Sequence, residues 1–375
     1  MSIASPLHDA LAAARQALVV GDAHVGIERG LQALLLARDQ GDASSAAAAG
    51  TLVAHHLFSA GHFEDALYHG HQALLQWQRQ HDHDHVCEVL VMLASACSDI
   101  GVDNEALEFA QQAFDIARAK GLAQRLNQAL SLLGALHGRL GDWDRGETLL
   151  LQALSRARDR HDEGAVLVAL NGLTALLVEM HATLGEAGDP ERAVAAAQRA
   201  LRHARHALVL AQDQPNPFRR VIVRSNVAGA LQANDRAEEA LAMLRECRAA
   251  ALADGQRALA LKAWTGEAKA LLRLGRHDEA AAALDEVFGR LQDSDHPKAS
   301  IDALRLRLSL AERQGDLARA DQHSADLALR VLRRQRKADA LSAALQEAAD
   351  RVQGALSRVE SEWLDLQRNG APKTH

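Results

Sequence analysis

The stretch GHFEDALYHGHQA, from Gly61 to Ala73, contains a pattern that returns along most of the chain. A glycine is followed five residues later by the small residue Ala66 and twelve residues later by Ala73. The same arrangement recurs every 40 residues, apart from two intervals of 47 residues. The copies start at Gly21, Gly61, Gly101, Gly141, Gly188, Asp235, Gly275 and Gly315.

Small residues occupy two further sets of positions around these turns. Five residues after each turn stand Gly26, Ala66, Ala106, Gly146, Ala193, Ala240, Ala280 and Ala320. Seven residues before it stand Ala14, Ala54, Ala94, Gly134, Ala228, Ala268 and Leu308, with Thr174 in this place once a seven-residue insertion is allowed for. Two antiparallel helices joined by a short turn approach closely only where the facing side chains are small. The pattern therefore predicts eight helix pairs.

These residues resemble the tetratricopeptide repeat, whose signature is a small residue, a turn glycine, an aromatic residue and an alanine at fixed offsets. Phe63 and Trp143 supply the aromatic residue, and Trp264 stands where the family often has a tryptophan. The resemblance covers residues 7–332 and implies an all-α superhelical solenoid. A period of 40 instead of about 34 residues implies helices longer by nearly a turn, as in the repeat-containing input regions of bacterial signalling proteins.

The sequence divides into three segments. Residues 1–332 form the repeat array, in which the prolines of QPNPF mark an internal seam near 213–219. Within the fifth pair, HATLGEAGDP is expected to project from the turn edge. Residues 333–368 continue a long C-terminal helix that starts near Leu317, and residues 369–375 are expected to be a disordered tail.

Composition narrows the class of protein. The chain is 48% hydrophobic but only 3% aromatic, which suits a core of alanine, leucine and valine between closely spaced helices. A net charge of −7 argues against nucleic acid as a partner. No signal-like start and no apolar run of about 20 residues is apparent, so a cytoplasmic protein without a membrane span is expected. The three cysteines have no paired spacing and are expected to be buried and reduced.

Catalytic and metal-binding signatures are weak. The chain has no glycine-rich phosphate loop, no HExxH and no nucleophile elbow, so neither an enzyme nor a cofactor is expected. The run HDHDH at residues 81–85 offers imidazoles and carboxylates, which are the donors that zinc or nickel uses. A solvated loop between repeats explains the same residues, and we expect no metal there.

The resemblance implies a binding surface on the first helices of the pairs, which line the concave side of such arrays. The residues expected there to contact a partner are Arg224, Asn226, Lys262, Lys269, Arg273, Arg305 and Arg313. Asn226 falls where peptide-binding members of the family hold a partner's backbone or terminal carboxylate, and Asn171 is one position off that place. The basic set favours an acidic or C-terminal segment. The alternative is that these side chains only keep exposed helices soluble.

The C-terminal helix carries a seven-residue repeat. Its main positions are Leu345, Val352, Val359 and Leu366, interleaved with Leu341, Ala348 and Ala355. Heptad spacing allows two helices to supercoil, which predicts a homodimer. A helix folded back as a cap on the last repeat would use the same residues.

The sequence leads to one main function hypothesis and two rivals. The main one is a non-catalytic module that binds a protein or peptide, as a signalling adaptor or regulator. A receptor that closes around a peptide pheromone or a small molecule is the first rival. The second, an enzyme, would need a cluster of acids and bases that the sequence does not offer at recognisable spacing.

Overall fold

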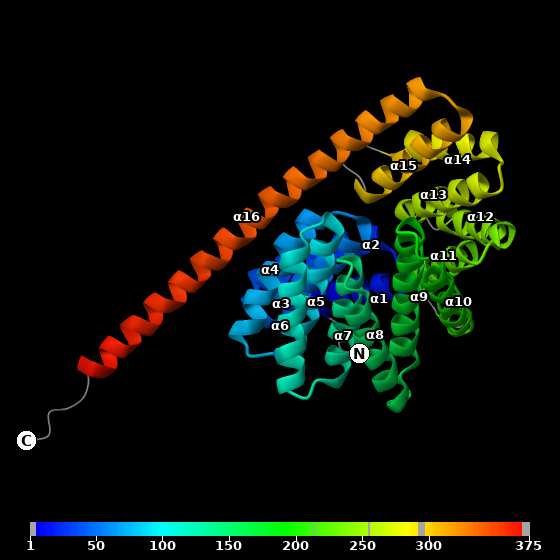
Figure 1. Cartoon of the computed structure of the whole chain (residues 1–375). Helices are drawn as coiled ribbons and strands as arrows, with labels where there is room; N and C mark the ends of the chain where they lie inside the picture. The colour runs from blue at the N-terminus through cyan, green and yellow to red at the C-terminus, as the bar shows by residue number, and fades with distance from the viewer. Residues whose placement is uncertain (1–4, 213, 215, 254–255, 292–296, 370–375) are drawn as a thin grey trace, which may run out of the picture.

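The computed structural model describes residues 5–212, 214, 216–253, 256–291 and 297–369, and their side chains as far as residue 347 except at 217–218, 257–258 and 297–298. These residues form sixteen α-helices and no strand (Figure 1). Consecutive helices pack in eight antiparallel pairs, which confirms the predicted all-α solenoid. In each pair the odd-numbered helix is called the first helix and the even-numbered one the second helix.

The helices have the following bounds. The first four pairs are α1 Pro6–Val20 with α2 Ala23–Asp39, α3 Ala43–Ala60 with α4 Phe63–Arg79, α5 His83–Ile100 with α6 Asp103–Ala119, and α7 Ala123–Arg139 with α8 Trp143–Asp159. The last four are α9 Glu163–Glu186 with α10 Pro190–Ala211, α11 Pro217–Ala233 with α12 Ala237–Ala253, α13 Arg257–Arg273 with α14 His277–Arg290, and α15 Pro297–Gln314 with α16 Leu317–Asn369.

A residue with left-handed backbone ends each of the first eight helices. These residues are spaced by 20 along the chain: Gly21, Gly41, Gly61, His81, Gly101, Gly121, Gly141 and His161. Glycine adopts a positive φ without a steric cost, which explains its place at six of the eight turns. Both turns of the 40-residue repeat are therefore tight, and its two helices have nearly equal length.

Aspartate starts many of the helices directly after these turns. Asp42 accepts a hydrogen bond at 3.0 Å from the backbone N–H of Ser45, and Asp162 accepts one at 2.9 Å from that of Ala165. Such a cap satisfies a donor that the first helical turn leaves open. Asp82 has the same role at the start of α5. The run HDHDH is therefore a helix boundary, with His83 already inside α5, and not the solvated loop that we expected.

The predicted small residues lie between the helices of each pair. Ala54, Ala94, Ala106 and Ala240 are fully buried, and Leu308, the large exception, is half-buried. The closest crossing joins α7 and α8, where a Cβ added to Gly146 would lie 2.7 Å from the carbonyl oxygen of Gly134. The register of the repeat is thus correct in these pairs.

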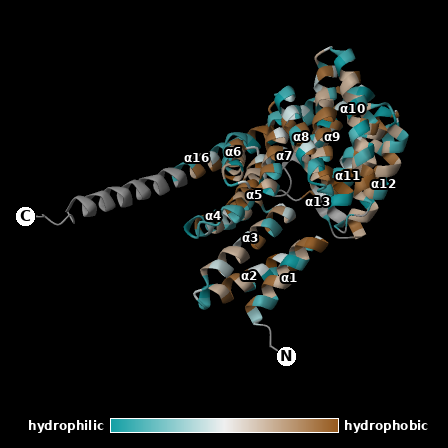
Figure 2. Ribbon diagram, turned by 90° about the horizontal axis from the view of Figure 1, so that it is seen from below, coloured by the Kyte–Doolittle hydropathy of each residue, from teal (hydrophilic) through white to brown (hydrophobic). Residues whose placement is uncertain are grey.

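The fifth pair carries most of its predicted insertion as helix. Residues 181–186 continue α9, which has 24 residues, and they lie beyond its last buried residue, Met180. By length and composition α9 would be able to cross a membrane, contrary to the sequence expectation. Half of the apolar stretch is buried inside the array, between α7, α8, α10 and α11. Its hydrophobic colouring in Figure 2 therefore marks a core helix.

The predicted seam near 213–219 falls where α10 ends at Ala211 and α11 begins at Pro217, but the core is continuous there. α9 packs directly against α11 across it, and one hydrophobic cluster runs from Cys87 to Leu244. Asn216 at this point donates a hydrogen bond of 3.4 Å to the carbonyl of Leu18, at the end of α1. The start of the array thus touches its middle.

α16 is one continuous helix of 53 residues, so no boundary separates residues 332 and 333. Its first part pairs with α15, and the helix then runs on past α4 (Figure 1). It contacts Glu64 in α4 and Glu105 in α6. Leu345 packs partly buried against the body of the array. The side chains of Val352, Val359 and Leu366, like residues 370–375 of the expected tail, lie outside what the structure describes.

We predict that Gly146→Ala destabilises the protein, although alanine is normally the better helix former by about 1 kcal/mol. Its Cβ would lie 2.7 Å from a backbone oxygen that moves only with the whole of α7, so we expect a loss of about 1–3 kcal/mol in the free energy of unfolding. Gly229→Ala is the control, because its Cβ would meet only Val178 at an ordinary 3.6 Å. Urea unfolding followed by circular dichroism measures both. Equal stability of the two variants would contradict the close crossing.

Candidate functional site

The inner surface of the array is formed by the first helices. Every first helix from α1 to α13 packs against the first helix of the next pair. Within the described residues, no second helix packs comparably against the next second helix. The second helices are thus farther apart, and the array curves with its first helices on the concave side. A partner that follows the array would meet polar residues of the first helices there.

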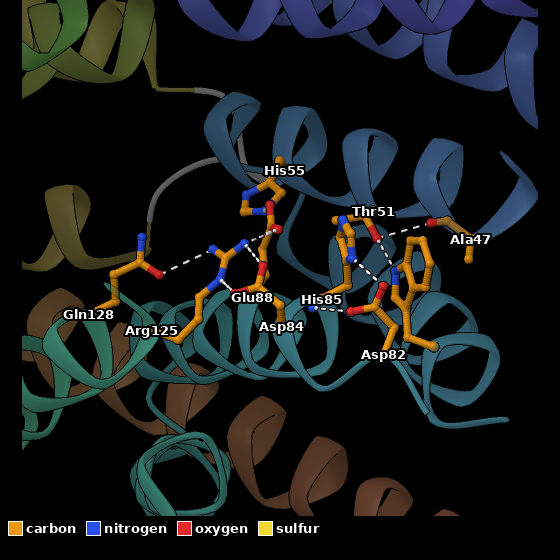
Figure 3. A network of polar contacts seen from close by, with 10 residues as sticks. Ala47, Thr51, His55, Asp82, Asp84, His85, Glu88, Arg125 and Gln128 are labelled. Atoms are coloured by element: carbon orange, nitrogen blue, oxygen red, sulfur yellow. Dashed lines mark hydrogen bonds and ion pairs between the residues drawn. The ribbon is translucent and has the colours of Figure 1, made fainter. Parts of the chain in front are cut away.

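One group of polar residues joins the first helices of the second, third and fourth pairs (Figure 3). Arg125 on α7 contacts Asp84 and Glu88 on α5, each at 2.7 Å from its Nη2 atom. Its Nη1 atom donates to Gln128 at 3.2 Å, and His55 on α3 lies 3.4 Å from the other oxygen of Glu88. We call these five residues the Arg125 cluster. Its charges pair with one another, so the cluster ties three first helices together.

The titration of Glu88 reflects this pairing. Desolvation alone would raise the pKa of Glu88, but the hydrogen bond with His55 and the charge of Arg125 outweigh it and lower the pKa to about 2. The pKa of Arg125 is raised, because its bonds with Asp84 and Glu88 outweigh desolvation. Both groups are therefore charged at neutral pH. A catalytic carboxylic acid would need the opposite shift.

A stacked pair lies beside this cluster. The rings of Trp77 and His85 are 4.2 Å apart and nearly parallel. The indole N–H of Trp77 donates to Thr51 at 3.0 Å, and His85 Nδ1 is 2.9 Å from a carboxylate oxygen of Asp82. The residues that the sequence offered as metal donors thus hold the junction between α4 and α5.

A second group joins the first helices of the fifth, sixth and seventh pairs. The amide nitrogen of Asn226 on α11 donates to the side-chain oxygen of Asn171 on α9 at 2.9 Å. Lys262 on α13 donates to the side-chain oxygen of Asn226 at 3.4 Å. We call these three residues the asparagine ladder. Two of the predicted residues, Asn226 and Lys262, are thus brought together, with Asn171 as a third member.

Lys269, also on α13, has an unusual environment. Solvent reaches the side chain, yet protein surrounds it on several sides, so desolvation lowers the pKa of its ammonium group. The nearby charge of Arg273 lowers this pKa further, and the carboxylates of Asp302 and Glu186 partly offset the effect. Such a position in a concave surface favours the arrival of another carboxylate.

Two other predicted residues have a structural partner. Arg273 donates to the carbonyl of Gln232, and Arg313 donates to the carbonyl of Leu272 at 2.8 Å. Arg139 does the same at 2.6 Å to the carbonyl of Ser98. Each arginine stands two residues before its turn and reaches 41 residues back. This repeated position was visible in the sequence, but its role in joining neighbouring first helices was not predicted.

The last two predicted residues pair locally. Arg224 is 3.5 Å from Glu246 on the second helix of its own pair, and Arg305 is 3.7 Å from Asp302 one turn earlier. Both arginines are largely exposed, so these ion pairs contribute little to stability. The predicted basic set is therefore not one continuous surface. Its centre is Asn226, Lys262 and Lys269.

The three cysteines are buried thiols in the core. Desolvation raises the pKa of Cys97 to about 12 and that of Cys87 to about 11. A thiol with so high a pKa is a poor nucleophile at neutral pH. These residues therefore serve packing.

We predict that Glu88→Gln lowers the free energy of unfolding at pH 7 by about 2–3 kcal/mol. The pKa of Glu88 falls from 4.5 to about 2 on folding, so its contribution is fully present above pH 4.5 and is lost as the pH falls towards 2. The difference from wild type should therefore shrink below pH 4.5. Glu108→Gln, at an exposed position of α6, is the control. Urea titrations between pH 7 and pH 3 give both values, and a difference that does not change with pH would contradict the pairing.

Comparison with known proteins agrees with this architecture. A tetratricopeptide-repeat family model matches residues 44–119, which are the second and third pairs. A search of curated protein sequences found no significant match.

Several solved structures have a similar fold. A Rap protein complexed with competence and sporulation factor superposes with a TM-score of 0.65 at 14% identity, covering 90% of this chain and 89% of that one. The Rap conjugation gene regulator of plasmid pLS20, in complex with the Phr* peptide, gives 0.64 at 14% identity, with coverage of 91% and 99%. The apo quorum sensor NprR from B. thuringiensis gives 0.54 at 14% identity, with coverage of 87% and 86%.

At this level of identity the superpositions establish the fold. The sequence match in the second and third pairs and the same pair architecture from α1 to α16 agree with each other. Residues 44–119 thus match the tetratricopeptide repeat by sequence, and the chain as a whole has the fold of a tetratricopeptide-repeat-like α-solenoid.

Proposed function

We propose that the protein is a non-catalytic binding module that holds a peptide or protein segment against its concave surface, as an adaptor or regulator in bacterial signalling. The observation that carries the proposal is the asparagine ladder, which places two amides and an ammonium group side by side on three successive first helices. An asparagine side chain offers a donor and an acceptor, the same groups that an extended peptide backbone presents. A ladder of this kind is suited to backbone recognition without regard to side chains.

The charge of the segment follows from the neighbouring lysines. Lys262 belongs to the ladder, and Lys269 is about two helical turns further along α13. Desolvation of Lys269 makes a new carboxylate partner favourable. We therefore propose an acidic segment or a C-terminal carboxylate as the ligand. Arg224, Arg273, Arg305 and Arg313 would act at the rim, in addition to the partners that they already have.

The similar structures support a peptide as ligand. One Rap protein is complexed with competence and sporulation factor, and the pLS20 regulator with the Phr* peptide. A receptor for a peptide pheromone or a small molecule is our alternative. The closed course of the array, in which α16 returns to the second and third pairs, favours a receptor that surrounds its ligand. A pocket of about 450 Å³ between α4, α5 and α6 is less suited, because it is lined mainly by residues of the second helices α4 and α6.

The proposal also covers where the protein acts and how its copies associate. We place the protein in the cytoplasm, where buried thiols stay reduced and the peptide-binding role would be exercised. We also propose that homodimerisation uses the heptad Leu345, Val352, Val359 and Leu366. Leu345 already contacts the body of the array, so a coiled coil would involve mainly the later heptads.

We predict that a random peptide library with free C-termini, selected on the wild-type protein, becomes enriched in aspartate and glutamate. Lys269→Glu should lower the affinity for the selected peptides by about tenfold, which corresponds to a loss of about 1.4 kcal/mol of binding free energy. Their affinity for the wild type should fall as salt rises, since the contacts are partly exposed. Fluorescence anisotropy measures both effects.

The matched control is Lys120→Glu, an exposed lysine at the end of α6 that lies outside the ladder. Selection of basic peptides, or equal binding by the Lys269 and Lys120 variants, would count against an acidic segment on this surface.

A further inference from the structure

α16 contacts the second and third pairs as well as α15, its partner in the eighth pair. Beyond its contact with α15, Arg334 donates from Nε to the carbonyl of Ile100 at 3.1 Å, more than 230 residues away in sequence. Lys337 lies 2.7 Å from a carboxylate oxygen of Glu64, at the start of α4. These partners stand at the turns of the second and third pairs, which α16 crosses in both views (Figures 1 and 2).

An apolar contact accompanies these polar ones. Ala338 is only 4% exposed and belongs to the hydrophobic cluster of the second and third pairs. Leu341 and Leu345 pack partly buried against the same cluster. Ser342, between them, donates to a carboxylate oxygen of Glu105. Positions 334, 338, 341 and 345 recur every three or four residues, so one face of α16 makes the whole contact.

The turn at Gly101 is shaped for this contact. Gly101 has a φ of +103°, and a Cβ at this position would lie 2.9 Å from the guanidinium group of Arg334. Glycine is therefore required at this position for two reasons, the backbone conformation and the close approach of α16. The opposite surface of the same helix, for example Ala340, is exposed.

A repeat array normally has contacts only between neighbouring units, so its curvature is free to vary. Here the eighth pair is joined to the second and third. We propose that α16 is a strap that holds the eighth pair against the second and third pairs and thereby sets the curvature of the concave surface. The contact consists of one buried alanine, two half-buried leucines, two part-buried hydrogen bonds and one exposed ion pair. So small a contact can open while the pairs themselves stay folded.

The consequence for binding rests on the proposed function. Opening the strap would alter the spacing between first helices, and with it the fit of a segment on the asparagine ladder. The strap itself does not depend on a ligand, so it can be tested on the free protein.

The test of the strap uses Ala338→Glu, which introduces a carboxylate into the buried contact, and Ala340→Glu as the control on the exposed side of α16. Small-angle X-ray scattering of the full chain should show a larger radius of gyration for Ala338→Glu alone, with an unchanged helical circular dichroism spectrum. The same radius of gyration for both variants would overturn the strap. If Ala338→Glu does not fold, Arg334→Ala replaces it, because it removes the hydrogen bond to Ile100 without adding a buried charge. Its radius of gyration should also exceed that of Ala340→Glu, and an equal value would overturn the strap.

A second measurement tests the contact directly. Glu105→Cys combined with Ser342→Cys should form an intramolecular disulfide on mild oxidation, because the two side chains touch. Glu105→Cys with Ala340→Cys should remain reduced, and the three native cysteines are buried and do not compete. Equal cross-linking of the two pairs, or none in the first, would refute the closed position of α16.

Discussion

The close crossing of two helices at glycine and alanine is the constraint on which the rest of the structure depends. At Gly134 and Gly146 the backbones of α7 and α8 approach so closely that neither position has room for a Cβ. With so few aromatic residues, the core gains its apolar contact area from many short distances instead of from large side chains. The left-handed turn every 20 residues from Gly21 to His161 then keeps each crossing in the same place along its pair.

The sequence predicts well those features that recur with the 40-residue period. Eight pairs, their turns and their buried small residues follow from the spacing alone, because each pair has to solve the same local packing problem. The prediction is less detailed where a segment departs from the period. Residues 181–186 belong to an insertion that we expected to project from the turn edge, and the structure extends α9 through them as helix, beyond its last buried residue, Met180.

The candidate site was predicted only in part, since it depends on which side chains meet across neighbouring pairs. Asn171 is one position out of register with Asn226, yet one residue of helix is a rise of only 1.5 Å, which a side-chain amide can bridge. Arg273 and Arg313 are expected at the ligand surface because they are basic residues on first helices, and in the structure each also has a carbonyl acceptor a full repeat away. Among the side chains that the structure describes, the contact of Arg334 with Ile100 has no counterpart in another repeat, so no period indicates it.

The two halves of the concave surface differ in what they can offer a ligand. In the Arg125 cluster each charge already has a partner, and a ligand carboxylate would have to displace Asp84 or Glu88. The asparagine ladder carries one charge, the ammonium group of Lys262, whose contact with Asn226 is 3.4 Å long. A ligand can shift a conformational equilibrium only by as much as it prefers one state over the other. A segment held on one helix would bind equally at any curvature. The affinity for a segment bonded to α9, α11 and α13 together would depend on the spacing of all three helices. Binding at the ladder would therefore respond to the shape of the array.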